Sequence, residues 1–159
     1  MRLYLVRHGK SNAKEINKRQ TLKSPLNEEG RKQAAALADR KSEEKVGVII
    51  SSKWNRAFQT AKIVSKRFKL TFEAIDGIHK KEQSPKLDGV SFESDTHKRY
   101  TEAVEKYEAN LNWKFEGTGE SIRDLINRTR DFQNHLLKVH SSESVLVVSH
   151  GLFIRALHN

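Results

Sequence analysis

Residues 2–9 read Arg-Leu-Tyr-Leu-Val-Arg-His-Gly, an apolar run that breaks at its last three residues. The run over 2–6 predicts a strand, and the Arg-His-Gly after it predicts a loop. Two further runs, over 46–51 and 144–149, are apolar without alternation, which is typical of parallel strands covered on both faces. Each run ends in polar side chains. Because ligands bind outside the carboxyl ends of such strands, we expect one site where the three ends meet.

Helical patterns separate the expected strands. Apolar residues recur at helical spacing in four stretches, which we expect to be helices: 27–39, 55–68, 95–113 and 120–140. Strands that alternate with helices predict an α/β fold. We therefore expect a single three-layer domain over 1–159, with a mostly parallel central sheet and helices on both faces. Residues 76–94 contain two Asp-Gly pairs and a proline, and predict an extended loop, which at this length is usually either functional or disordered.

The composition restricts the chemistry. Thirty Lys and Arg against 20 Asp and Glu leave a net charge of +10, which attracts anions such as phosphate. The basic residues are scattered, so we do not expect nucleic acid as the main partner. No run approaches the roughly 18 apolar residues of a membrane span, so we expect no membrane partner either. Cysteine is absent, which excludes thiolate catalysis and fits the cytoplasm. The oligomeric state stays open.

The loop after the first run suits an anion at every position. Arg7 offers a planar fork of donors that matches phosphate oxygens. His8 can attack phosphorus through a neutral ring nitrogen. Gly9 lets the backbone approach a ligand closely, and Ser11 and Asn12 supply neutral donors. Taken alone, the segment fits equally well an Arg and a His that simply end a strand.

The ends of the other two apolar runs, 46–51 and 144–149, also carry side chains that suit an anion. Arg56 falls in the first turn of an expected helix, where outward N–H groups favour anions and an arginine is unfavourable for the helix dipole. By itself it also fits a solvated surface residue. His150 and Gly151 follow the third run. Two histidines in matching strand-His-Gly contexts favour a single site in which Arg7, Arg56 and His150 surround His8.

Five segments then carry a family resemblance. They occur in family order through nearly the whole chain: 5–9 (Leu-Val-Arg-His-Gly), 24–34 (Ser-Pro-Leu-Asn-Glu-Glu-Gly with Gln-Ala), 51–61 (Ser-Ser, Arg-Ala and Gln-Thr-Ala), 119–121 (Gly-Glu-Ser) and 148–151 (Val-Ser-His-Gly). The chain resembles the histidine phosphatase superfamily, also called phosphoglycerate-mutase-like. The resemblance implies the phosphoglycerate-mutase-like fold, transient phosphorylation of His8, a phosphoryl group held by Arg7, Arg56 and His150, and no metal or cofactor.

The proton donor is the weakest part of the resemblance. The family places a Glu or an Asp in the loop after the third strand. Glu82 is our prediction by proximity, with Asp76 and Asp88 as alternatives, while strict spacing from Ile78 puts Lys80 at that place. A positioned acid contributes about 10²–10⁴-fold. If no carboxylate reaches the pocket, good leaving groups such as those of phosphohistidine or an acyl phosphate are favoured.

These features predict a phosphatase that hydrolyses a phosphomonoester or another phosphorylated substrate, a small molecule or a phosphoprotein, through a phosphohistidine on His8. A mutase-type phosphotransferase is the first alternative. It needs a closed pocket, and no large insertion between Glu82 and Gly119 is available to build one. A phosphate-binding module without turnover is the second alternative. The sequence leaves the identity of the substrate open.

Overall fold

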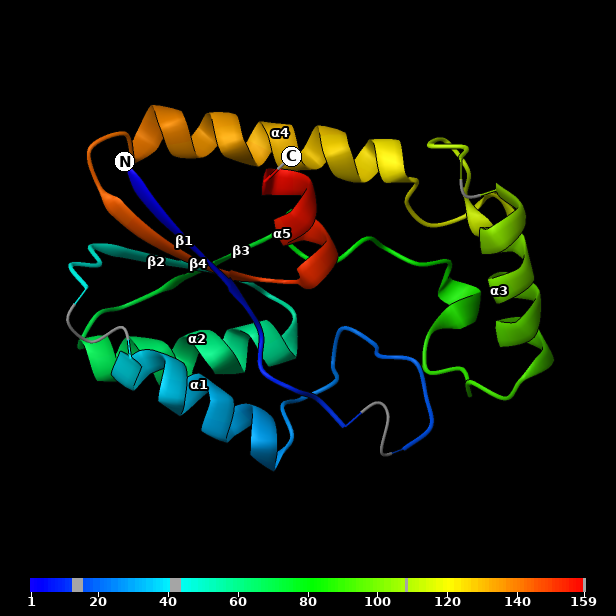
Figure 1. The fold of residues 1–159 in the computed structure, drawn as a ribbon, viewed down its shortest axis with the longest axis horizontal. Coiled ribbons are helices and arrows are strands. Elements are labelled where there is room, and N and C mark those ends of the chain that lie inside the picture. The colour runs from blue at the N-terminus through cyan, green and yellow to red at the C-terminus, as the bar shows by residue number, and fades with distance from the viewer. Residues whose placement is uncertain (13–15, 41–43, 108, 159) are drawn as a thin grey trace.

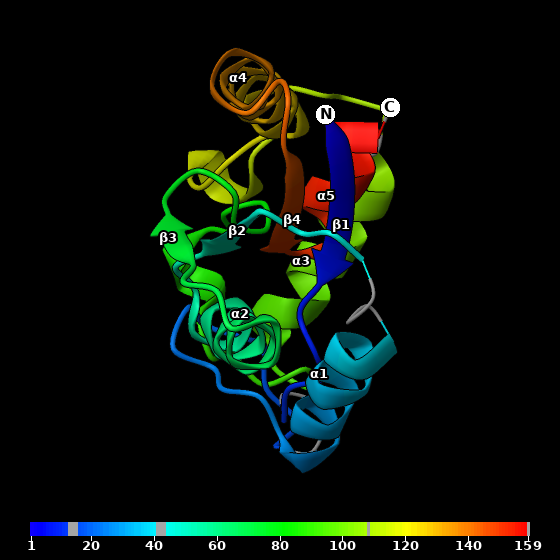
Figure 2. The same ribbon diagram turned by 90° about the vertical axis from the view of Figure 1, so that its left-hand side faces the viewer.

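The described strands form one fully parallel sheet. The computed structural model describes residues 1–12, 16–40, 44–107 and 109–158. Its strands are β1 (Arg2–Arg7), β2 (Val48–Ser52), β3 (Glu73–Ile75) and β4 (Ser144–Ser149), arranged in the order β1-β4-β2-β3. Figure 2 shows the four strands side by side. The last strand in sequence thus lies between the first two, so the ends of β1, β4 and β2 are neighbours.

Helices cover both faces of this sheet. Helices α1 (Glu28–Arg40) and α2 (Asn55–Phe68) lie on one face, and α4 (Ile122–Val139) and α5 (Gly151–His158) lie on the other (Figures 1 and 2). Helix α3 (Asp95–Tyr107) lies at one end of the molecule, beyond the carboxyl ends of the strands (Figure 1). The predicted α/β fold with three layers and a parallel sheet is confirmed.

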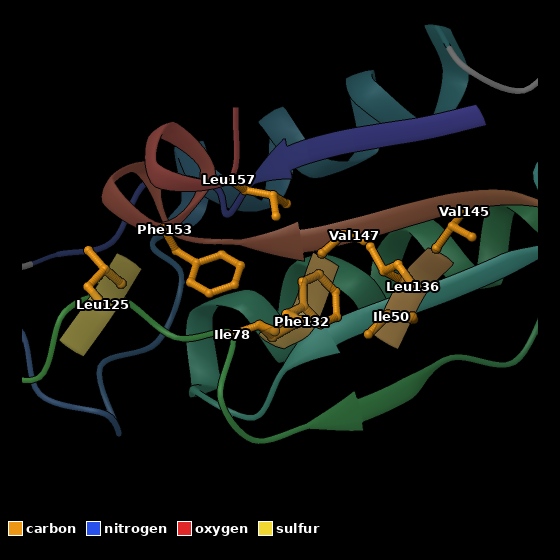
Figure 3. Close-up of a cluster of buried hydrophobic side chains, with 9 residues drawn as sticks. All are labelled: Ile50, Ile78, Leu125, Phe132, Leu136, Val145, Val147, Phe153 and Leu157. Carbon is orange, nitrogen blue, oxygen red and sulfur yellow. The ribbon is translucent and has the colours of Figure 1, made fainter. Parts of the chain in front are cut away.

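Two apolar clusters explain why the strand runs lack alternation. On the α4 and α5 side, Ile50 and Val147 pack against Phe132 and Phe153 (Figure 3). The next positions on the same two strands face the opposite way and pack against the alanine-rich faces of α1 and α2. Because successive strand residues point to opposite faces, both sets must be apolar when both faces are covered.

Two elements differ from the expectation. Strand β3 was not predicted, because a strand of 3 residues is too short to show a periodic pattern. Helix α3 ends at Tyr107 rather than at 113, and residue 108 lies outside the described residues. Trp113 stacks on Tyr107 with ring centroids 5.8 Å apart, so the chain turns back on the helix instead of extending it. The predicted loop over 76–94 contains a short 3₁₀ turn, Pro85–Leu87, and an isolated bridge from Ser91 to Lys18.

No helix in the described part of the chain combines the length and the apolar character that crossing a membrane requires.

Candidate active site

Strand register brings the two histidines together. Arg7 of β1 pairs with Ser149 of β4, and the N–H of His8 donates to the carbonyl of Ser149 at 3.0 Å. His8 and His150 therefore leave the sheet side by side, and their ring centroids lie 4.9 Å apart. Two residues 142 positions apart in the chain meet because their strands are hydrogen-bonded neighbours.

Arg56 joins these rings from the first turn of α2. Its side chain is fully buried, with 0% of its surface exposed. The guanidinium donates from Nε to His8 Nε2 at 3.1 Å, from one terminal nitrogen to the carbonyl of Thr21 at 2.9 Å, and from the other to His150 Nδ1 at 3.2 Å. A solvated surface role is thereby excluded. The planar fork of arginine is the side chain that can donate in three directions at once.

His8 presents an unprotonated nitrogen toward Arg56. Its Nδ1 lies 2.7 Å from the carbonyl of Gly9, which can only accept, so Nδ1 carries the proton and Nε2 keeps its lone pair. Burial, followed by the nearby charges of Arg56, Arg7 and Lys80, lowers the pKa of His8 to about 4, although the hydrogen bond to Gly9 acts in the opposite direction. At neutral pH the ring is therefore uncharged, as a nucleophile at phosphorus requires.

His150 is held neutral as well. Its Nδ1 accepts from Arg56, so its Nε2 carries the proton and donates to Ser52 Oγ at 3.1 Å. Burial and the positive charge of Arg56 lower the pKa of His150 well below its ordinary value. Burial and the charge of Arg7 also lower the pKa of Arg56, to about 10, which still leaves the guanidinium protonated at neutral pH.

A pocket of about 380 Å³ lies beside His8, and some of the other predicted phosphate ligands line it. Arg7 and Ser11 line it, and Gln20 Nε2 donates to Ser11 Oγ. The Arg7 side chain passes over Gly151, where an added Cβ would lie 3.5 Å from it. Gly151 opens α5, so its backbone lies at a helix N-terminus. Asn12 is half-buried, and its carbonyl accepts from the N–H of Ile16 at 3.0 Å.

Two glycines let the His8 loop lie directly on the start of α1. A Cβ at either Gly9 or Gly30 would collide with the other segment's backbone. Asn27 closes the contact, because its N–H donates to the carbonyl of Lys10 at 3.0 Å and its Oδ1 accepts from the N–H of Gly30 at 2.8 Å. The close approach therefore explains the glycine in the first turn of α1.

Sequence reasoning missed Trp54, which organises one wall of the site. Its ring stacks on His79 at 5.2 Å, meets the edge of His150 at 5.3 Å and lies 5.0 Å from the guanidinium carbon of Arg56. The ammonium of Lys80 lies 5.9 Å from the same ring. The position of Trp54 in the sequence could have indicated this role, because Trp54 directly precedes the helix that carries Arg56.

The predicted acids lie farther out. Glu82 has a side chain 61% exposed, and its Oε1 is 3.5 Å from His79 Nε2. Asp76 forms an exposed ion pair with Lys53 at 2.6 Å, and Asp88 is exposed. Among the described contacts, none joins any of these three carboxylates to His8 or Arg56. The described residues also contain no cluster of three or more His, Asp or Glu side chains that could hold a metal ion.

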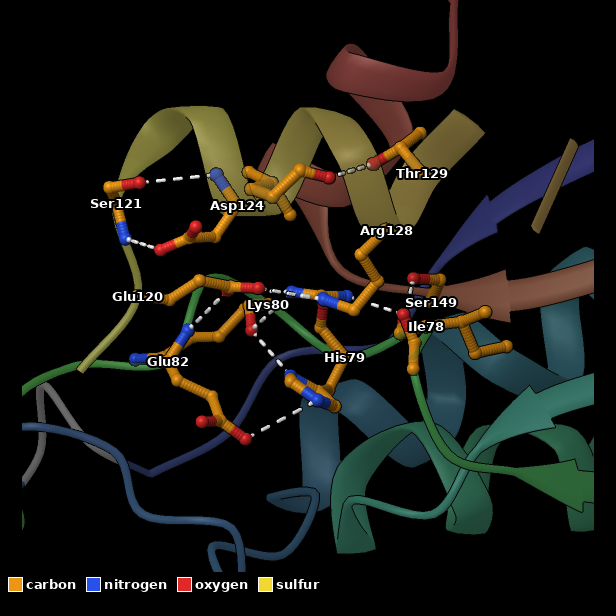
Figure 4. A network of polar contacts seen from close by, with 12 residues as sticks. Ile78, His79, Lys80, Glu82, Glu120, Ser121, Asp124, Arg128, Thr129 and Ser149 are labelled. Atoms are coloured by element: carbon orange, nitrogen blue, oxygen red, sulfur yellow. Dashed lines mark hydrogen bonds and ion pairs between the residues drawn. The ribbon is translucent and has the colours of Figure 1, made fainter. Parts of the chain in front are cut away.

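A mostly buried ion pair holds the loop that carries these residues. Arg128 donates to both oxygens of Glu120, at 2.8 and 2.7 Å, and also to the carbonyls of Gly77, His79 and Lys80 (Figure 4). Glu120 in turn accepts from the N–H of Glu82 at 2.9 Å. The Gly-Glu-Ser segment thus acts as a clamp on residues 77–82, and Ser149 Oγ adds a bond to the carbonyl of Ile78 at 2.5 Å.

Glu120→Gln should lower the free energy of unfolding by about 3 kcal/mol, near the lower end of the range for breaking a buried ion pair. The side chains of Arg128 and Glu120 are 17% and 11% exposed, so the variant leaves the Arg128 charge nearly buried with no carboxylate partner. Urea unfolding measures the change. Asp76→Asn, in the exposed pair with Lys53, is the control and should change stability by less than about 1 kcal/mol. Equal losses in the two variants would contradict the clamp.

Comparison with known proteins identifies the family. The model of the histidine phosphatase superfamily (branch 1) matches residues 3–159. The chain is 32% identical to phosphoserine phosphatase 1 of Hydrogenobacter thermophilus over 160 residues, covering 99% of this chain and 74% of that protein. It is 31% identical to a metal-independent phosphoserine phosphatase of Arabidopsis thaliana over 159 residues, covering 98% of this chain and 66% of that protein.

A solved structure of a mycobacterial glucosyl-3-phosphoglycerate phosphatase in complex with VO3 superposes with a TM-score of 0.84 at 25% identity, covering 98% of this chain and 78% of that one. The parallel sheet, the paired histidines at its edge and the family match over nearly the full length lead to one conclusion: this chain belongs to the histidine phosphatase superfamily.

Proposed function

We propose that this protein is a metal-independent phosphatase that hydrolyses a phosphomonoester through a phosphohistidine on His8. The observation that carries the proposal is the contact between His8 Nε2, which is unprotonated, and the Arg56 guanidinium, whose Nε donates to it at 3.1 Å. A neutral nucleophile beside a fixed cation is the arrangement that phosphoryl transfer needs, because charge spreads over the equatorial oxygens in the transition state.

The reaction proceeds in two steps. His8 Nε2 attacks phosphorus, the bond between phosphorus and the leaving oxygen breaks, and that oxygen takes a proton. Water then attacks the phosphohistidine, which releases inorganic phosphate and restores His8. In both steps Arg7 and Arg56 donate to the phosphoryl oxygens, and Ser11, Asn12 and the backbone at Gly151 add neutral donors. His150 donates there when its Nε2–H exchanges Ser52 Oγ for a phosphoryl oxygen. Glu82 stays a prediction for the proton donor.

The relatives support a phosphorylated small molecule as substrate. Two similar proteins are named phosphoserine phosphatases, and a structural neighbour is named a glucosyl-3-phosphoglycerate phosphatase. These names share a phosphate ester on a small organic acid or sugar acid. We extend that class of substrate to this chain and place the reaction in the cytoplasm, in line with the cysteine-free composition.

Incubation with phosphoserine and with 3-phosphoglycerate should release inorganic phosphate and leave no isomerised ester. Phosphate is measured colorimetrically, and the remaining ester is analysed by ³¹P NMR. Release should continue after metal ions have been removed with a chelator. Isomerised ester as the main product would instead indicate a phosphotransferase, and binding of phosphate without any turnover would indicate a binding module.

A further inference from the structure

The groups that contact the nucleophile cannot supply the proton that the leaving oxygen needs. His8 and His150 are neutral, and each uses its only N–H to donate to a neighbour, Gly9 or Ser52. Arg56 keeps its proton at neutral pH, because its pKa of about 10 is far above 7. A donor must therefore come from a group around this centre that is protonated at working pH and can lose its proton.

Lys80 meets this requirement by position. Its ammonium lies 5.9 Å from the centre of the Trp54 ring, the same ring that Arg56 and His150 approach at 5.0 and 5.3 Å. Its backbone is fixed, because the Lys80 carbonyl accepts from His79 Nδ1 at 2.7 Å and from Arg128 at 3.5 Å (Figure 4). The side chain thus extends from a clamped loop toward Trp54, whose ring also contacts Arg56 and His150.

The neighbouring lysine has different surroundings. The charged groups whose fields act on Lys80 belong to several segments: Arg56 of α2, Arg19 of the loop before α1, and Asp88 and Lys81 of its own loop, while the Lys80 charge itself acts on His8 and His150. Lys81 instead interacts with Glu120, Asp124 and Lys114, and shares only Arg19 with Lys80. Burial, followed by the charges of Arg56 and Arg19, lowers the pKa of Lys80 to about 8, and Asp88 only partly opposes this.

We propose that the Lys80 ammonium, rather than a carboxylate, protonates the leaving oxygen in this enzyme. The proposal rests on the proposed function. When His8 Nε2 bonds to phosphorus and the ester P–O bond breaks, one proton passes from Lys80 Nζ to the leaving oxygen, which departs as an alcohol. The neutral amine then takes a proton from the water that attacks the phosphohistidine, so that Lys80 is charged again when phosphate leaves.

The test compares two esters in the full-length chain. Lys80→Met should lower kcat for phosphoserine by about 10²-fold or more, the range of a positioned acid, and kcat for p-nitrophenyl phosphate by less than about tenfold, because p-nitrophenolate leaves without a proton. Lys81→Met is the matched control and should leave both rates within about threefold. The ratio of the kcat values for the two esters tests the role of Lys80. Phosphate release from p-nitrophenyl phosphate by the wild type tests the proposed function.

Lys80→Arg separates proton donation from charge. The arginine keeps the positive charge but cannot release its proton. Lys80→Arg should therefore have the wild-type KM for phosphoserine, while its kcat should be as low as that of Lys80→Met. In the wild type, kcat/KM for phosphoserine should fall as pH rises through about 8, where Lys80 loses its proton, and as pH falls through about 4, where His8 gains one. The alkaline limb should be absent in Lys80→Arg.

Three results would overturn the proposal. If Lys80→Met lowered kcat equally for the two esters, Lys80 would be a phosphate ligand and not the proton donor. Full recovery of kcat in Lys80→Arg would reduce its role to charge. A loss confined to phosphoserine in Glu82→Gln, with Lys80→Met unaffected, would restore Glu82 as the donor. If the wild type releases phosphate from neither ester, the proposed function fails as well.

Discussion

His8→Ala is expected to lower kcat by at least about 10⁴-fold. Removing the nucleophile abolishes the covalent route and leaves only substrate binding and the fixed positive charges. No neighbouring side chain can take the place of the His8 ring. Its Nδ1 donates to the Gly9 carbonyl, and its Nε2 accepts from Arg56. His150 cannot take over, since both of its nitrogens are bonded to Arg56 and Ser52. Steady-state phosphate release measures the loss.

The same variant should lose the covalent intermediate. Brief reaction with a ³²P-labelled ester followed by denaturation should trap an acid-labile, base-stable adduct on the wild type and none on His8→Ala. His135→Ala removes an exposed histidine of α4 and is the control, which should keep both the adduct and the rate. Labelling of His8→Ala at the wild-type level would mean that another residue is the nucleophile.

Arg56→Ala should lower kcat by about 10²–10³-fold or more, the loss that follows removal of one donor to a developing oxyanion. The expected loss is at least that large because Arg56 touches both histidines and the Thr21 carbonyl, so its removal also frees the rings it aligns. Arg56→Lys should recover little, since a single ammonium cannot replace a fork that bonds in three directions.

A second arginine on α2 supplies the control. Arg67 lies near the end of that helix, where it forms an ion pair with Asp39 at 2.8 Å while its side chain is 59% exposed. Arg67→Ala should leave kcat within about twofold and change stability by less than about 1 kcal/mol. Wild-type kcat in Arg56→Lys would show that charge alone, without the fork, is sufficient.

Much of the fold could be predicted from local patterns. The runs around residues 2–6 and 144–149 are apolar because both faces of their strands are covered, and that condition leaves a readable trace in the sequence. Strand β3 left no such trace because it is too short. The end of α3 was misplaced because Leu111 continues the helical pattern of the sequence, although Trp113 turns back onto Tyr107.

The sequence by itself determined the kind of chemistry: Arg7, His8, Arg56 and His150 stand at strand ends, and their types suit an anion. Only the tertiary structure decided which groups touch. Hydrogen bonding of β4 between β1 and β2 sets His8 beside His150, burial makes both rings neutral, and the Arg128 clamp orients the loop of Lys80 and Glu82. Contact, desolvation and loop direction depend on segments distant in the chain, so spacing within one segment cannot reveal them.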